Sequence, residues 1–201
     1  MTATEPVVGE MVAQGILHTS MNQILTSTLC AFLAFAANAG AGTLAIDKAK
    51  SRIQVDAKAT GHEFTGTLSD FTATVSGDDT TLAPSAVDLK WKFADLKTED
   101  DKRDAEMLKW LGKAGGEGSF RFIKTWTDAG QTYAQGTIKI HGVSKTIAFP
   151  YTAKKDGSWV SIDGNAALDY QDFGLPIIRS MAVMTVNPKL NIRFHLVGES
   201  K

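Results

Sequence analysis

Apolar and polar residues alternate with a period of two along most of the chain from residue 43 onward. Between residues 52 and 59, isoleucine, valine and alanine alternate with charged and amide side chains, and the same period recurs over residues 87–93 and 190–196. This period is typical of strands that have one buried and one solvated face. The pattern therefore predicts a domain built mainly from half-buried strands.

Turn-forming residues separate these segments. Clusters of glycine with aspartate, serine or threonine occupy residues 76–79, 127–130 and 155–158, at the spacing of antiparallel meanders. No alternation of strands with helices is present, so the pattern disfavours a parallel sheet. The expected architecture is a β-barrel or a β-sandwich.

One segment, residues 98–116, has a helical period instead. Thr98 can cap a helix, residues 99–101 are acidic and favour its positive end, and Met107, Leu108 and Leu111 share one face. The sequence predicts a single helix that crosses the β-domain. Its apolar face can plug a packed core or cover a cavity, and the spacing favours the plug.

Composition limits the partners. A chain of 201 residues with 43% hydrophobic residues and a formal charge of −1 has enough residues for one domain and an appendage. It has no basic stripe that could neutralise phosphates, which excludes nucleic acid as an expected partner. A single cysteine, Cys30, leaves no internal disulfide.

The N-terminal residues predict export. An apolar run over residues 24–36 is too short to span a bilayer and is followed by small residues that a signal peptidase can recognise. We expect translation to start at Met21, residues 1–41 to form an N-terminal extension and signal peptide, and residues 42–201 to form the folded domain. The alternative is a buried helix of a cytoplasmic protein.

Polar candidates for catalysis are few. His141, Ser144 and Lys145 lie close together in the segment GTIKIHGVSKTIAF, but no neighbouring residue could orient a catalytic base, so a hairpin turn at Gly142 is the favoured interpretation. In that hairpin, residues 138 and 140 would face residues 147 and 149. The histidines lie far apart, the acidic residues 99–104 suit helix capping, and no phosphate-binding glycine loop is present. We expect no metal and no cofactor.

Large apolar side chains are numerous in the strand segments. Such a set usually forms a packed core, but an eight-stranded barrel is also wide enough to hold one slim ligand. We expect Trp91 and Phe93 to line a cavity of this kind, with Met107 and Leu111 as its roof. The predicted ligand-binding residues are Val55, Phe64, Leu68, Trp91, Phe93, Met107, Leu111, Phe122, Ile138, Phe173 and Phe194.

Several motifs together resemble the YceI-like polyisoprenoid-binding proteins. They are LAIDKAKSRIQVDAKAT (residues 44–60), FTGTLSDFTATV (64–75), DLKTEDDKRDAEMLKWL (95–111), GTIKIHGVSKTI (136–147) and LDYQDFGLP (168–176). Their order and spacing carry the resemblance, which covers residues 42–199. It implies a lipocalin-like antiparallel barrel of about eight strands with one helical insert, located in the periplasm.

The same resemblance implies a binding protein without enzymatic activity. Its ligand would be a polyisoprenoid or a similar amphiphilic lipid, such as an isoprenoid quinone, and transient membrane contact and a homodimer are both compatible with it. Two other functions stay open. A stress-related structural or protein-interaction barrel would have a filled core and no lipid, and a hydrolase would depend on Ser144 or His141.

Overall fold

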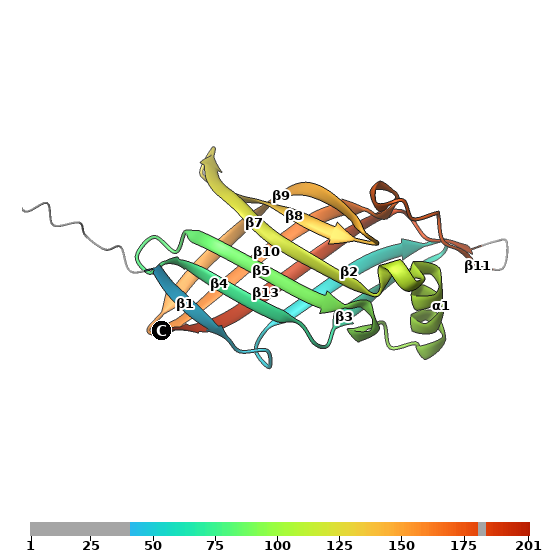
Figure 1. Ribbon diagram of the computed structural model, residues 1–201, viewed down its shortest axis with the longest axis horizontal. Helices are drawn as coiled ribbons and strands as arrows, with labels where there is room; N and C mark the ends of the chain where they lie inside the picture. The colour runs from blue at the N-terminus through green and yellow to red at the C-terminus, as the bar shows by residue number, and fades with distance from the viewer. Residues whose placement is uncertain (1–40, 181–183) are drawn as a thin grey trace, which may run out of the picture. The chain divides into compact units, whose positions relative to one another are not determined.

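The computed structural model describes residues 41–180 and 184–201, and the predicted signal peptide lies outside these residues. Eight antiparallel strands pair in the order β1-β4-β5-β7-β8-β9-β10-β13, and β13 pairs back to β1 and closes a barrel (Figure 1). The predicted all-β barrel of eight strands is confirmed. Its strands are β1 (Ala41–Ile46), β4 (Thr72–Asp78), β5 (Pro84–Lys92), β7 (Glu117–Asp128), β8 (Gln131–Ile140), β9 (Val143–Asp156), β10 (Trp159–Asp169) and β13 (Lys189–Ser200).

Shorter elements complete one end of the barrel. β13 is longer than β1, and the part of its edge that β1 leaves free pairs with β2, which in turn pairs with β3 and then β6. No helix in residues 41–180 and 184–201 has the length and apolar character needed to cross a membrane. The short elements are β2 (Arg52–Ala59), β3 (His62–Leu68), η1 (Phe93–Asp95), β6 (Leu96–Lys97), η2 (Lys113–Gly115), η3 (Tyr170–Phe173), β11 (Arg179–Ser180) and β12 (Met184–Thr185).

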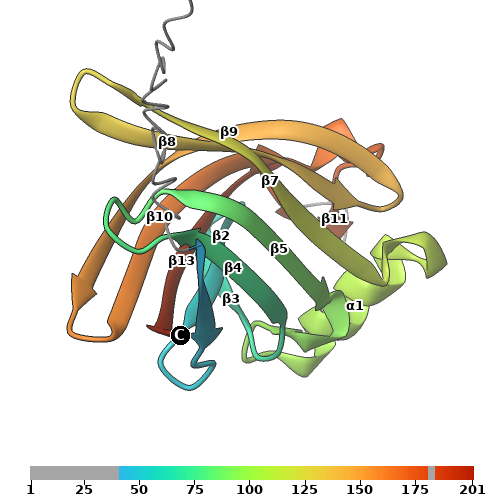
Figure 2. The same ribbon diagram turned by 60° about the vertical axis from the view of Figure 1, so that its left-hand side comes forward.

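The predicted helix is α1 (Asp101–Leu111), and it lies at this same end of the barrel (Figures 1 and 2). Its cap is Asp100, whose side chain accepts a hydrogen bond from the Arg103 N–H, so the prediction that Thr98 caps the helix is wrong. Thr98 is buried instead, and its hydroxyl donates to the Asp104 carboxylate over 2.6 Å. This bond leaves the capping position to Asp100, two residues further along the chain.

A packed core closes the barrel below α1. Leu111 is buried in one cluster with residues of β8, β10 and η3, and Phe173 is 1% exposed at its centre. Burial of this kind contributes about 1.5–3 kcal/mol for each large side chain. The helix therefore plugs a solid core, as its spacing favoured. The cluster contains Leu111, Ile138, Ile140, Leu168, Tyr170, Phe173 and Leu175.

The segment 136–149 is a hairpin with a two-residue turn. His141 and Gly142 have φ angles of 50° and 77°, the conformation that a type I′ turn requires. The turn pairs Ile140 with Val143, and Ile138 with Lys145. The expectation that residues 138 and 140 face residues 147 and 149 is thus wrong in register, because the loop has two residues, which brings Ile147 and Phe149 opposite positions 136 and 134.

Candidate functional site: an apolar cavity in the barrel

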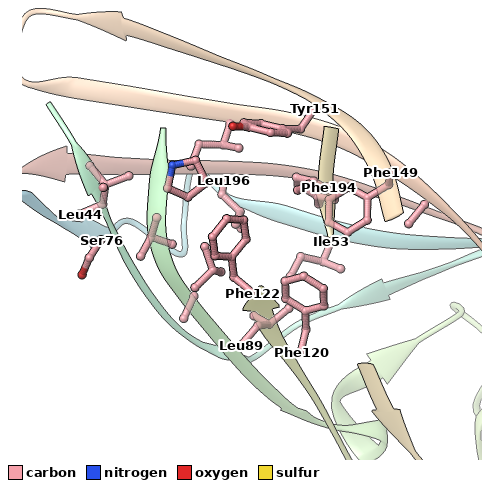
Figure 3. A pocket seen from close by; sticks show the side chains of 18 of the residues that line it. Leu44, Ile53, Ser76, Leu89, Phe120, Phe122, Phe149, Tyr151, Phe194 and Leu196 are labelled. Atoms are coloured by element: carbon pink, nitrogen blue, oxygen red, sulfur yellow. The ribbon is translucent and has the colours of Figure 1, made fainter. Parts of the chain in front are cut away.

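The interior of the barrel holds a cavity of about 180 Å³. Every barrel strand contributes at least one residue to its wall, and β2, β3 and β6 add one residue each near the α1 end. Figure 3 shows labelled side chains of β1, β2, β5, β7, β9 and β13 around a common space. The aromatic residues of the wall are Trp91, Phe120, Phe122, Phe149, Tyr151 and Phe194.

Three of these aromatic rings lie across glycines of a neighbouring strand. A Cβ atom at Gly118 would come within 3.0 Å of Trp91, and one at Gly136 or Gly164 would come equally close to Phe120 or Phe194. A larger residue at any of these glycines would occupy the space of the ring. The glycines therefore let the rings lie flat against the wall and leave the centre of the barrel open.

The cavity is long and narrow. Its wall follows β5 from Pro84 near one end of the barrel to Trp91 near the other. These residues are seven positions apart, so they are separated by about 23 Å along the strand. With the usual strand tilt, this corresponds to about 17 Å along the barrel axis. The space suits a slender chain better than a compact ring system.

At the end away from α1 the cavity wall reaches the surface, because it includes the exposed Asp79 of the connection between β4 and β5 (residues 79–83); this end is called the mouth (Figure 1). Asp79 and Leu82 of this connection both belong to the cavity wall. Leu82 has a φ of 58°, which is unusual for a bulky residue. The connection thus places a strained leucine over the opening.

Polar contacts hold this connection across the mouth. The Lys155 ammonium lies 3.3 Å from a carboxylate oxygen of Asp79 and donates to its carbonyl oxygen over 3.4 Å. β4 and β9, which end near these residues, are four strands apart in both directions around the barrel. The Ser200 hydroxyl also donates to Asp79, over 2.5 Å. These contacts, with the Ser200 bond as the largest cause, lower the pKa of Asp79 below its ordinary value.

The cavity brings together five of the eleven predicted ligand-binding residues. They come from five different strands, and Trp91 also packs against both cores near α1. Trp91 therefore forms the boundary between the open cavity and the packed end. These five residues are Leu68, Trp91, Phe122, Ile138 and Phe194.

The other predicted residues lie outside the cavity wall, at the packed end. The chain leaves β5 before Phe93, which belongs to η1 and packs against both cores together with Met107. Met107 and Leu111, which the sequence predicts as the roof of the cavity, are therefore separated from it by Trp91 and its neighbours. Leu111 and Phe173 are buried in the core below α1.

Val55 and Phe64 are also at the packed end. Val55 packs against the core formed by residues of β2, β3 and β6. Phe64 is half-buried, and the Arg103 guanidinium lies over its ring, 4.4 Å from the centroid. The residues of this core fill the space in front of Val55, and Phe64 contacts Arg103 of α1 and does not belong to the cavity wall.

Sequence reasoning missed the residues of the mouth. Asp78 and Asp79 belong to the predicted turn at residues 76–79, and the sequence pattern assigns no role to Leu82 or Tyr151. The alternation of Ile147, Phe149 and Tyr151 along one strand would have indicated Tyr151. No local pattern reveals that a turn folds over the opening of a barrel.

The polar groups considered for catalysis are not arranged for it. Ser144 is exposed, and in the described part of the chain no hydrogen bond joins it to His141, whose Nδ1 lies 3.3 Å from the Phe173 carbonyl oxygen. The His195 Nδ1 lies 2.6 Å from an oxygen of Asp163, on the outer side of the barrel. Among the described residues, no three His, Cys, Asp or Glu side chains gather as a metal site would need.

Comparison with known families decides the classification. The YceI-like domain family matches residues 44–198, which is most of the chain. The chain belongs to the YceI-like family. A search of curated proteins gives no match.

Solved structures share the fold of this YceI-like protein at low sequence identity. Burkholderia cenocepacia BcnA is 20% identical, with a TM-score of 0.65 over 76% of this chain and 99% of that one. A polyisoprenoid binding domain from Saccharophagus degradans, implicated in plant cell wall breakdown, is 12% identical, with a TM-score of 0.58 over 80% and 99%. The Campylobacter jejuni YceI protein is 18% identical, with a TM-score of 0.56 over 68% and 84%.

Proposed function

We propose that this YceI-like protein is a periplasmic carrier that holds the tail of a polyisoprenoid or similar long-chain amphiphile inside its barrel. The observation that carries the proposal is the apolar cavity, which runs from the mouth below residues 79–83 to Trp91. The Saccharophagus domain, which has the same fold, is described as polyisoprenoid-binding. The proposal therefore rests on the shape and chemistry of the cavity together with family membership.

The energetics favour an apolar tail. Removing apolar surface from water stabilises a complex by about 25 cal/mol for each Å², so about 100 Å² of buried tail contributes about 2.5 kcal/mol. Apolar cavities of about 150 Å³ stay dry and bind ligands of the size of benzene. The present cavity is somewhat larger, at about 180 Å³. The cavity supports this proposal over the structural or protein-interaction alternative, which requires a filled core.

A hydrolase is the weaker alternative. Acyl transfer needs a nucleophile within hydrogen-bond reach of a base that a third group orients. His195 has an orienting partner in Asp163, but in the described residues no hydrogen bond links its ring to a serine, threonine or cysteine. We propose a binding function without catalysis.

The mouth of the barrel carries exposed aromatic residues that suit contact with a membrane. Trp126 lies near the end of β7, and Trp159 begins β10, both on the mouth side, and each is 37% exposed. Lys50 lies over the Trp159 ring, with Nζ 3.6 Å from the centroid. Tryptophan with an adjacent cation is suited to the interface of a bilayer. We infer transient membrane contact at this end.

Cosedimentation with phospholipid vesicles tests that contact. The double variant Trp126→Ser, Trp159→Ser should bind vesicles more weakly than the unaltered protein while its tail binding is retained. Equal cosedimentation of the two proteins would contradict the inference.

Binding of a radiolabelled polyprenol tests the proposed function directly. Delipidated mature protein should elute from gel filtration with one mole of polyprenol per mole. The Trp91→Lys variant, which places a charge at the deep end of the cavity, should retain no labelled polyprenol under the same conditions. Failure of the folded wild-type protein to retain any polyprenol would rule out the carrier.

Export can be tested separately. The natively secreted protein should have an intact mass that corresponds to a start near residue 40. A mass that retains residues 2–20 would contradict the signal peptide and the proposed periplasmic location.

A further inference from the structure

The charged side chains of the cavity wall are all acidic. Among the residues that the structure describes, no lysine, arginine or histidine belongs to the wall, although Asp78 and Asp79 both do. The other polar wall residues are Ser76, Trp91 and Tyr151. A desolvated anion requires cationic or hydrogen-bond-donating partners, and the wall residues between 41 and 180 and between 184 and 201 supply no cation.

Asp78 is an ionised carboxylate beside the mouth. Its Oδ1 accepts hydrogen bonds from the Thr81 N–H (2.6 Å), the Thr81 hydroxyl (2.9 Å) and the Thr80 N–H (3.0 Å). These bonds, with that from the Thr81 N–H as the largest, hold the pKa of Asp78 below its ordinary value. Asp78 has no basic side chain within ion-pair distance among the described residues. Its charge is therefore available to repel an anion.

Lys155 lies beside the mouth and is already paired with Asp79. Its ammonium contacts both the carboxylate and the carbonyl oxygen of Asp79. A phosphate at the mouth would have to displace Asp79 to reach Lys155, and Asp79 would then lose its partner. Asp78, Asp79 and Lys155 together carry a net negative charge.

Tyr151 supplies a hydrogen-bond acceptor further inside. The Thr125 hydroxyl donates to the Tyr133 carbonyl oxygen over 2.7 Å, and it lies 3.1 Å from the Tyr151 hydroxyl. Because the Thr125 proton is used, the Tyr151 hydroxyl donates to Thr125, and what it offers to a ligand is an oxygen lone pair. Carboxylates are also acceptors only. Ser76, the remaining hydroxyl of the mouth, lies 3.4 Å from the hydroxyl of Thr43.

From this one-sided chemistry we propose that the cavity selects amphiphiles with an uncharged, hydrogen-bond-donating head group, an alcohol, over those with a phosphate or carboxylate head. This inference rests on the proposed lipid-binding function and specifies the head group. An alcohol O–H can donate to Asp78, Asp79 or Tyr151 while the tail fills the cavity. A phosphate offers further acceptors and negative charge to groups that are themselves acceptors.

Calorimetric titration of the delipidated protein with farnesol and farnesyl monophosphate, which share one tail, tests the proposal. At low ionic strength, farnesol should bind at least tenfold more tightly than farnesyl monophosphate. This difference in affinity should become smaller as added salt screens the carboxylates. In Asp78→Asn, which keeps an acceptor oxygen and loses the charge, farnesyl monophosphate should bind at least threefold more tightly, and the ratio of the farnesol affinity to the farnesyl monophosphate affinity should fall.

The matched control is Asp156→Asn. Asp156 is an exposed carboxylate on the hairpin between β9 and β10 and does not belong to the wall, so this variant changes the net charge equally. Asp156→Asn should leave the preference for farnesol over farnesyl monophosphate unchanged. Equal or tighter binding of the phosphate by the wild-type protein, or equal effects of the two variants, would overturn the head-group inference alone. Binding of neither probe would overturn the proposed function, and the head-group inference with it.

Discussion

Gly118 offers a direct test of the cavity, because it lies under the Trp91 indole at the deep end. A Cβ atom built on Gly118 would come within 3.0 Å of three indole atoms and of no backbone atom among its nearest neighbours. Ordinary contact between carbon atoms requires about 3.5–4.0 Å. In Gly118→Ala the indole must therefore move by about 1 Å, and the open space lies toward the cavity.

This displacement should weaken tail binding by a calculable amount. A shift of about 1 Å excludes about one or two methylene groups from the deep end, and each buried methylene contributes about 0.8 kcal/mol. The loss of about 0.8–1.6 kcal/mol corresponds to about four- to fifteenfold weaker binding. The fold should tolerate the change, since alanine costs less backbone entropy on folding than glycine.

Calorimetric titration with a polyprenol measures the change in affinity, and thermal unfolding measures the change in stability. Gly116→Ala is the matched control, because a Cβ at Gly116 meets no atom within 4 Å and its φ is −66°. Gly116→Ala should bind like the wild type. Wild-type affinity in a Gly118→Ala variant with unchanged unfolding temperature would refute the assignment of Trp91 to the ligand-binding wall.

Three further predictions address the cavity, the mouth and the outer face. Trp91→Lys should abolish tail uptake, because burying an unpaired ammonium in the apolar end is prohibitive; a folded variant that still retains polyprenol contradicts this. Lys155→Met removes the contact across the mouth and should accelerate release of bound lipid severalfold in a stopped-flow exchange assay, whereas Lys154→Met should not, and equal rates would exclude a closing role for the Asp79 contact. Asp56 has its pKa lowered to about 2, chiefly by the hydrogen bonds from Arg193. Its ion pair therefore stabilises the fold fully above pH 4 and is lost as the pH falls through about 2, where half of the carboxyls are protonated. Asp56→Asn should cost about 1 kcal/mol at pH 7, allowing for solvent screening, and clearly less at pH 2. Urea unfolding at the two pH values measures this, and an equal loss at both would contradict it.

The fold was predictable because its signals are local. Alternation with a period of two identified the strands, and the helical period of Met107, Leu108 and Leu111 identified α1. The helix cap was assigned to the wrong residue, since Thr98 and Asp100 both suit the position in the sequence. Only the buried bond between Thr98 and Asp104 separates the two.

The cavity was predictable only in part, because alternation shows which side chains face inward but not where the interior is filled. Phe93 continues the pattern of Trp91, yet the chain turns into η1 at that residue, which directs it to the packed end. Val55 faces inward, but neighbouring residues fill the space in front of it. Contact between Asp79 and Lys155 depends on barrel closure, which no segment of sequence encodes alone.

The most direct test of the carrier is mass spectrometry of an organic extract from the mature protein, purified from the periplasm without detergent. The account predicts a long-chain isoprenoid amphiphile at about one mole per mole of protein, with an uncharged head group. A well-folded protein that yields no lipid would contradict the carrier function, and a stoichiometric phosphorylated lipid would contradict the proposed head-group selection.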